Sequence, residues 1–162
     1  MPALATLDTG PRVLNAGDLE RVIAIDRAQG DHARRRFFEK RFAAAAAHPE
    51  DFIHVGVTRG GTLRGFAFAR LLRGEFGREH VTAVLDAIGV EPVSRETGIG
   101  RSLLQELVAR LRAVGARTLH SQAEWSDPEL THFFAATGFR LAPRVALERS
   151  LATPLVEQIE DV

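Results

Sequence analysis

Two kinds of reactive side chain are absent from this sequence. The chain of 162 residues has no cysteine and no tyrosine. Without cysteine it can form no disulfide, no thiolate zinc site, no iron–sulfur cluster and no acyl-cysteine intermediate. Without tyrosine, any mechanism that requires a phenolic acid cannot run in its usual form.

Net charge and long apolar runs are absent as well. The chain has 21 basic and 21 acidic side chains, so its formal net charge is +0. A neutral chain lacks the long-range field of a non-specific nucleic-acid binder, and we expect no nucleic-acid partner. No stretch approaches the ~18 apolar residues of a membrane span, and the N-terminus does not resemble a signal peptide. We therefore expect no membrane segment and a cytoplasmic location.

What is present describes an ordinary globular chain. Hydrophobic residues make up 45% of it and charged residues 26%. Because domains cluster around 100–150 residues, we predict a single domain over residues 1–162. Its core spans about 12–151, and the acidic tail 152–162 is weakly patterned.

Hydrophobic periodicity predicts the order of the elements. Extended segments and strands are expected at 12–15, 52–58, 62–72, 81–90, 117–125 and 144–151, and helices at 19–29, 32–47, 99–114 and 128–137. Asp18 and Asp127 are the expected N-caps, and Trp125 is expected in the core. The order predicts an α/β domain with a mixed, mostly antiparallel central sheet flanked by helices.

A glycine-rich turn, Arg95-Glu-Thr-Gly-Ile-Gly-Arg101, separates the apolar strand at 81–90 from the helix at 99–114. Glycines let consecutive N–H groups at a helix N-terminus converge on one point, which favours phosphate. A Walker loop would need Gly-Lys-Ser/Thr, but Arg101 follows Gly100. A Rossmann fingerprint would need a third glycine where Leu103 stands.

The remaining pattern, Arg-x-x-Gly-x-Gly after a strand, resembles the acetyl-CoA pyrophosphate loop of the GNAT N-acetyltransferase superfamily. Downstream, Asp127, Phe134 and Gly138-Phe139 resemble the family's Asn…Tyr…Gly-Phe signature. The element order from residue 12 to 151 is also similar to that family's fold. The resemblance thus covers nearly the whole chain and implies the GNAT acyl-CoA N-acyltransferase fold.

The resemblance implies acetyl-CoA as co-substrate and no metal. Its pyrophosphate would be held by the backbone N–H groups of four loop residues, with Arg95 at the loop entrance. Those four residues are Gly98, Ile99, Gly100 and Arg101. The main chain of Ile88 and Val90 would bind the pantetheine arm. The alternative reading of the glycines is a tight turn before a helix, and Arg101 could simply be solvated.

Two residues depart from the family pattern. Phe134 stands where the family has its tyrosine acid, and a phenyl ring has no proton to donate. A thiol has a pKa of about 8.5, so a thiolate can leave toward a helix N-terminus without full protonation. Asp127 replaces the usual Asn near the pantetheine and thiol, and its simplest role is the N-cap.

For the general base, the reaction needs a carboxylate that faces the cleft. Asp86 interrupts an apolar strand, which is costly unless the group is hydrogen-bonded or functional. Glu124, at the end of the next strand, is the competing candidate. Either carboxylate could instead be a paired structural charge.

We interpret the chain as an N-acetyltransferase acting on a primary amine of a small molecule or peptide, by direct attack in a ternary complex. The alternatives are a non-catalytic acyl-CoA-binding module and, more remotely, a nucleotide-binding interaction domain. A homodimer is possible through the open edge of the C-terminal strand. The basic run from His32 to Arg41 is expected to be a solvated helix face, or else a site for an anionic acceptor.

Overall fold

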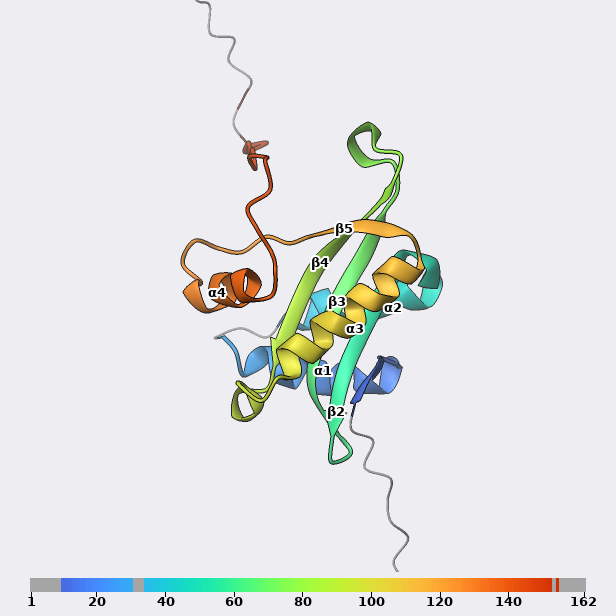
Figure 1. Cartoon of the computed structure of the whole chain (residues 1–162), viewed down its shortest axis with the longest axis vertical. Helices are drawn as coiled ribbons and strands as arrows, with labels where there is room; N and C mark the ends of the chain where they lie inside the picture. Colours follow the sequence, from blue (N-terminus) through green and yellow to red (C-terminus); the bar gives the residue numbers. More distant parts are fainter. Residues whose placement is uncertain (1–9, 31–33, 153, 155–162) are drawn as a thin grey trace, which may run out of the picture.

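One five-stranded sheet organises the molecule, with its strands in the order β1-β2-β3-β4-β5 (Figure 1). The computed structural model describes residues 10–30, 34–152 and 154. The strands are β1 (Gly10–Val13), β2 (Phe52–Arg59), β3 (Thr62–Leu72), β4 (Val81–Val90) and β5 (Ala116–His120). The first three junctions are antiparallel and β4 pairs with β5 in parallel. The predicted mixed, mostly antiparallel sheet is therefore confirmed.

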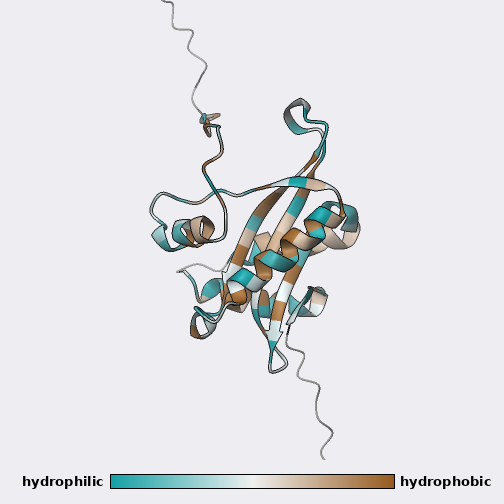
Figure 2. Ribbon diagram, in the orientation of Figure 1, coloured by the Kyte–Doolittle hydropathy of each residue, from teal (hydrophilic) through white to brown (hydrophobic). Residues whose placement is uncertain are grey.

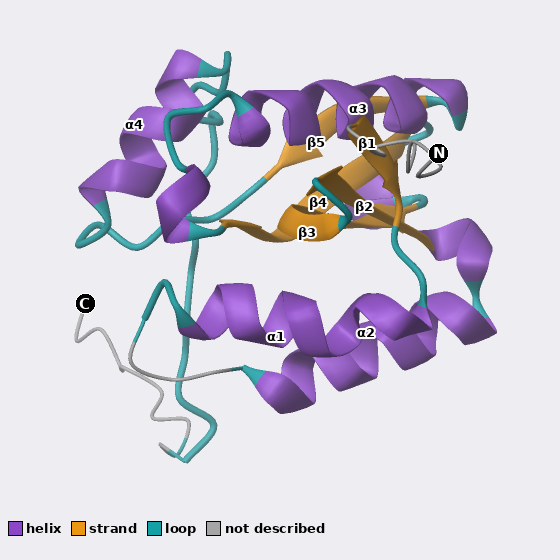
Figure 3. Ribbon diagram, turned by 90° about the horizontal axis from the view of Figure 1, so that it is seen from below, coloured by secondary structure: helices purple, strands orange, loops and turns teal. Residues whose placement is uncertain are grey.

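Helices cover both faces of this sheet. They are α1 (Leu19–Arg27), α2 (Arg35–Ala47), α3 (Ile99–Ala113) and α4 (Pro128–Ala136). Short 3₁₀ turns lie at Ala16–Asp18, Pro49–Asp51, Glu75–Gly77 and Pro92–Ser94. Figure 3 shows α1 and α2 on one side of the sheet and α3 on the other. Within the described ranges, no helix is both long and apolar enough to cross a membrane.

The two faces have different cores. Against α3 the core is aliphatic and includes Leu103 and Leu107, both fully buried. Against α1 and α2 it is built on phenylalanine: Phe38 meets the rings of Phe66 and Phe68 edge-on, each at 5.4 Å. Figure 2 shows hydrophobic residues along the strands and on α3, with polar residues between them.

Local signals place several turns and caps as expected. Gly60 and Gly61, with φ of 59° and 73°, form the two-residue turn between β2 and β3. Asp127 accepts a hydrogen bond from the Leu130 N–H at 3.0 Å and caps α4. Asp18 occupies the N-cap position of α1, as expected, but its carboxylate makes no cap bond to that helix. It accepts instead from Arg12 and from the Asn15 N–H.

Helix and strand boundaries also differ from the prediction. The structure begins α2 at Arg35, whereas His32 lies outside the described residues. It ends α1 at Arg27, ahead of the expected stop at Gly30. β1 begins two residues before the expected extended segment 12–15.

The C-terminal part departs most from expectation. β5 ends at His120 rather than at 125, and no strand forms within 144–151. Alternation predicts which side chains share a face, but a strand also needs a neighbour to bond with, and this segment has none within the described residues. Val145 and Leu147 are consequently 81% and 90% exposed. Trp125, expected in the core, is 98% exposed.

Candidate functional site

The N-terminus of α3 carries unpaired backbone donors. Gly98 precedes the helix with φ of 83°, a left-handed conformation that favours glycine. The first helical hydrogen bond runs from the Ser102 N–H to the Gly98 carbonyl at 3.0 Å. The N–H groups of Ile99, Gly100 and Arg101 come before it, and no side chain of the described residues caps them. Together with the helix dipole, they can accept an anion.

Hydrogen bonds within the preceding loop fix its shape. The Ser94 N–H donates to the Glu91 carbonyl at 2.8 Å, and the Thr97 hydroxyl donates to the Ser94 carbonyl at 2.5 Å. From the β2–β3 hairpin, Arg59 donates to the Thr97 carbonyl at 3.2 Å. The loop is therefore held from both ends before any ligand arrives.

Glu91, directly after β4, anchors this loop to the sheet and to α1. Its carboxylate accepts from Arg64 at 2.6 Å, from Arg21 and from the Ser94 hydroxyl. The hydrogen bonds from Arg64 and then Arg21 hold the pKa of Glu91 below its usual value. Sequence reasoning missed Glu91, because its partners lie 27 and 70 residues away along the chain.

β4 and β5 separate beside this loop. Their pairing ends at Val84 and His120, and the Ser121 hydroxyl then bonds to the Leu85 carbonyl at 3.2 Å. The Glu91 N–H points to β3, where it bonds to the Arg64 carbonyl. Because backbone groups alternate along a strand, those of Ile88 and Val90 point to the opposite side, into the gap beyond the paired part of β5.

The second predicted signature lies on α4. Phe134 is 9% exposed and packs on Phe139, with ring centroids 4.7 Å apart. The neighbouring Phe133 lies over the first turn of α3, since a Cβ added to Gly100 would be 2.9 Å from its ring. Gly100 thus lets α4 approach the loop closely, and Phe134 acts as a core side chain.

Two arginines border the loop. Arg95 reaches Glu129 of α4 at 3.4 Å, and both side chains are exposed. Arg101 lines a cavity of about 270 Å³ between α3 and the end of α4, together with Leu104 and Thr137. The Arg95 side chain is thus held by α4, and that of Arg101 faces the cavity between α3 and α4.

Asp86 and Glu124, the candidate bases, lie in unlike surroundings. The register of β3 and β4 passes from Phe68–Ala87 to Ala69–Leu85, so Asp86 is the extra residue of a bulge. Its carboxylate is 8% exposed and lies 3.0 Å from the Nε atoms of both Arg70 and Arg41. Glu124 lies beyond the end of β5, in an exposed turn, and its carboxylate makes no bond to the described residues.

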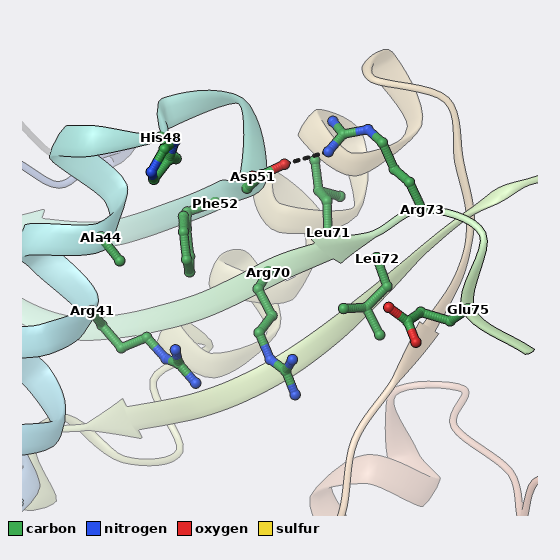
Figure 4. A pocket seen from close by; sticks show the side chains of 10 residues that line it. All are labelled: Arg41, Ala44, His48, Asp51, Phe52, Arg70, Leu71, Leu72, Arg73 and Glu75. Atoms are coloured by element: carbon green, nitrogen blue, oxygen red, sulfur yellow. Dashed lines mark hydrogen bonds and ion pairs between the residues drawn. The ribbon is translucent and has the colours of Figure 1, made fainter.

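A cavity of about 540 Å³ opens beside the Asp86 cluster, between α2 and the end of β3 (Figure 4). Arg41 and Arg70 extend into it side by side. On its far wall Asp51 pairs with Arg73. Its remaining lining residues are Ala44, His48, Phe52, Leu71, Leu72 and Glu75.

A buried histidine lies on the same face of the sheet. His54 stacks on Phe68 with centroids 4.0 Å apart and is 7% exposed. Burial, reinforced by the charge of Arg41, lowers the pKa of His54 to about 4. His54 is therefore neutral at physiological pH.

A possible metal-ligand group is formed by His48, Glu50 and Asp51, whose ligand atoms lie within 4.8 Å of one another. His48 and Glu50 are exposed, and Asp51 is already paired with Arg73. These contacts fit a surface ion-pair cluster.

Comparison with known proteins adds a family and a set of similar folds. The model of the "Acetyltransferase (GNAT) family" matches residues 18–139. No curated protein sequence is similar enough to count as a match.

Three solved structures illustrate the likeness of fold. A putative acetyltransferase from Agrobacterium tumefaciens has a TM-score of 0.73 at 16% identity, covering 87% of this chain and 99% of its own. An aminoglycoside 6′-N-acetyltransferase from Acinetobacter haemolyticus has a TM-score of 0.73 at 14% identity, covering 87% and 97%. The aminoglycoside N-acetyltransferase AAC(6′)-Iy in complex with CoA has a TM-score of 0.67 at 20% identity, covering 86% and 98%.

Proposed function

Because the chain belongs to the GNAT family of acetyltransferases, we propose that it moves an acetyl group from acetyl-CoA to a primary amine. The observation that carries this proposal is the N-terminus of α3, where three consecutive N–H groups lack a partner among the described residues. Diphosphate is the group that such donors and a helix dipole bind well.

In this proposal acetyl-CoA lies along the gap between β4 and β5. Its pyrophosphate contacts the N–H groups from Gly98 to Arg101, and Arg95 adds positive charge nearby. Its pantetheine arm bonds to the backbone of Ile88 and Val90, as an added strand would. Asp127 and Phe134 border the arm from α4, and the thioester reaches the bulge at Asp86.

The chemistry is a direct transfer. The nitrogen of a neutral amine attacks the thioester carbonyl carbon, the tetrahedral intermediate expels the CoA thiolate, and the nitrogen loses its extra proton to a base or to water. A ping-pong route through cysteine is excluded, since the chain has none. Phe134 can donate no proton, so the thiolate leaves unprotonated or takes its proton from water.

We propose Asp86 as the group that accepts the proton, because it lies at the bulge where β4 leaves β5. Glu124 is the second candidate, because its carboxylate is free to move. Asp86→Asn and Glu124→Gln separate them. The variant that lacks the true base should show a flattened pH dependence of kcat/KM, whereas the other variant should keep the wild-type profile.

The proposal is tested by measuring CoA release from acetyl-CoA over a panel of primary amines. We expect saturable, amine-dependent release, with the N-acetylated amine identified by mass spectrometry. Tight binding of acetyl-CoA without turnover of any amine would instead favour the alternative, a non-catalytic acyl-CoA-binding module. Protection against heat by NAD or ATP but not by CoA would favour a nucleotide-binding domain.

Self-association is part of the proposal too. Among the described strands β5 pairs only with β4, so its other edge is open. Val145, Leu147 and Leu151 are at least 81% exposed, and their segment begins beside β5, where Arg144 Nη1 lies 3.3 Å from His120 Nε2. Such a segment and an open edge can pair between two copies. Light scattering coupled to size exclusion should show a dimer, which changing Leu147 to Lys should weaken; a monomer at all concentrations contradicts this part.

A further inference from the structure

The two arginines beside Asp86 have unused donors. Arg70 donates to Asp86 through Nε, and the contact of Arg41 with Asp86 is through Nε as well. The terminal nitrogens of both guanidinium groups bond to no acceptor within the described residues. A guanidinium presents five N–H donors in a rigid fork, so most of the donor capacity of this pair is left over.

The cluster of Arg41, Arg70 and Asp86 also has an unbalanced positive charge. Two guanidinium groups share one carboxylate, which leaves one positive charge on the part of the 540 Å³ cavity that Arg41 and Arg70 line. On the far wall the charge of Arg73 is already matched by Asp51. The carboxylate of Glu75 belongs to an exposed residue at the other end of the lining.

The arginines are held in place before any ligand binds. Their side chains are only 27% and 39% exposed. Arg41 also lies over the ring of Phe37, 5.1 Å from its centroid. A preorganised fork loses less side-chain entropy when it closes on an anion than a mobile surface arginine does.

We propose that this cavity binds the acceptor by an anionic group, a carboxylate or a phosphate, which the terminal nitrogens of Arg41 and Arg70 hold as a bidentate clamp. The inference rests on the proposed function. It makes the acceptor a small amine that carries its own negative charge, with the amine directed toward Asp86 and the thioester. Both anions match the guanidinium fork.

The same clamp disfavours a polycationic acceptor. One solved structure with a similar fold is an aminoglycoside acetyltransferase in complex with sisomicin, at 15% identity and a TM-score of 0.67. In this chain, the end of the cavity formed by Arg41 and Arg70 has one unmatched positive charge, which would repel a cationic group placed there, whereas the carboxylate of Glu75 lies at the other end of the lining. The acceptor class therefore differs from that of this neighbour.

Acetyl transfer by the full chain tests the clamp with matched acceptors. O-phosphoethanolamine and β-alanine carry an anion, ethanolamine carries none, and sisomicin is a polycation. We expect kcat/KM to be at least tenfold higher for an anionic amine than for ethanolamine, and sisomicin to be the poorest acceptor. The ratio of the two anionic amines tells whether phosphate or carboxylate is preferred. Equal use of ethanolamine, or preference for sisomicin, overturns the proposal.

Variants connect this preference to the arginines. Arg70→Gln should raise KM for the anionic amine about tenfold to a hundredfold, as expected for the loss of charge-assisted hydrogen bonds, and leave KM for acetyl-CoA unchanged. Arg70→Lys keeps the positive charge but loses the planar guanidinium, so its KM for the anionic amine should lie between those of the wild type and Arg70→Gln. Arg110→Gln is the matched control, because Arg110 lies on α3, on the other side of the sheet from the cavity, and its guanidinium pairs with Glu106. Equal effects of Arg70→Gln and Arg110→Gln contradict the clamp.

A binding measurement separates this inference from the proposed function. Calorimetry with N-acetylglycine and N-acetylglycinamide, which differ only in carboxylate against amide, needs no turnover. Binding of the first and not the second supports the clamp even if no amine is acetylated. If acetyl-CoA binds and amines turn over while the two probes bind equally, the clamp alone is wrong.

Discussion

The two faces of the sheet use different chemistry. On the α3 face the core is aliphatic, and the candidate ligand groups are backbone N–H groups of consecutive residues. On the α1 and α2 face the core is aromatic, and the candidate ligand groups are side chains from three elements, Arg41, Arg70 and Asp86. We assign the first to acetyl-CoA and the second to the acceptor.

This difference explains what the sequence could predict. A glycine loop before a helix is a local pattern, so residues 98–101 indicate a candidate phosphate site without knowledge of the fold. The contacts of Asp86 with Arg41 and Arg70 span 45 and 16 positions along the chain and appear only once α2 lies over β3 and β4. The glycine loop could therefore be located in the sequence, and so could Asp86, whereas the arginine partners of Asp86 could not.

The largest effect is expected on the α3 face. Gly100→Asp puts a carboxylate among the free N–H groups, and its Cβ would lie 2.9 Å from the ring of Phe133. We expect calorimetry to detect no binding of acetyl-CoA, while N-acetylglycine still binds the other face. The fold should persist, because aspartate is favourable in the first turn of a helix.

The matched control for this variant is Ala113→Asp. Ala113 is exposed at the opposite end of α3, so the change adds the same charge to the same helix but away from its free N–H groups. Acetyl-CoA affinity should match that of the wild type. Unchanged affinity in Gly100→Asp would remove the basis for assigning the α3 face to the cofactor.

Truncating each core tests whether both faces support the fold. Phe38→Ala should cost about 3–5 kcal/mol and Leu107→Ala about 2–5 kcal/mol of unfolding free energy, since each opens a cavity in a packed core. Both side chains are 0% exposed. Urea denaturation measures the two values. A loss below about 1 kcal/mol at either site means that its face is not packed as described.

His54 should make the aromatic face sensitive to pH. Its folded pKa of about 4 lies below the unfolded value of 6.5, so the unfolded chain binds the proton first as pH falls. Its contribution to stability is complete above pH 6.5 and is lost progressively toward pH 4, to a total of about 3 kcal/mol.

Denaturation of His54→Gln between pH 5 and 6.5, a range above the pKa of ordinary carboxyl groups, checks this assignment. The slope of stability against pH should flatten in that variant. His132, exposed on α4, provides the control, because His132→Gln should keep the wild-type slope. A wild-type slope in His54→Gln would contradict a buried, neutral His54.

The smallest effect concerns the anchor between the faces. Glu91→Gln removes the negative charge that pairs with Arg21 and Arg64 but keeps the shape of the side chain. Because Glu91 positions the loop without touching the reacting atoms, KM for acetyl-CoA should rise several-fold, about 1 kcal/mol, with kcat unchanged. An equal fall in kcat would show that Glu91 acts on the reaction itself.

The C-terminal part shows what a hydrophobic pattern alone cannot predict. The alternation of residues 144–151 predicts a strand, yet Val145, Leu147 and Leu151 are exposed. Alternation predicts which side chains of a segment share a face. It does not specify the neighbouring strand, which lies elsewhere in the chain or in another copy. By contrast, α4 was predicted well because its signals, Asp127 followed by Pro128, act within one turn.

The most direct test of two ligands on two faces is an initial-rate study of CoA release, with acetyl-CoA varied at several fixed concentrations of the acceptor amine. Direct transfer in a ternary complex predicts double-reciprocal lines that intersect. Parallel lines would indicate a covalent acetyl-enzyme and contradict the account, as would release that does not depend on the amine.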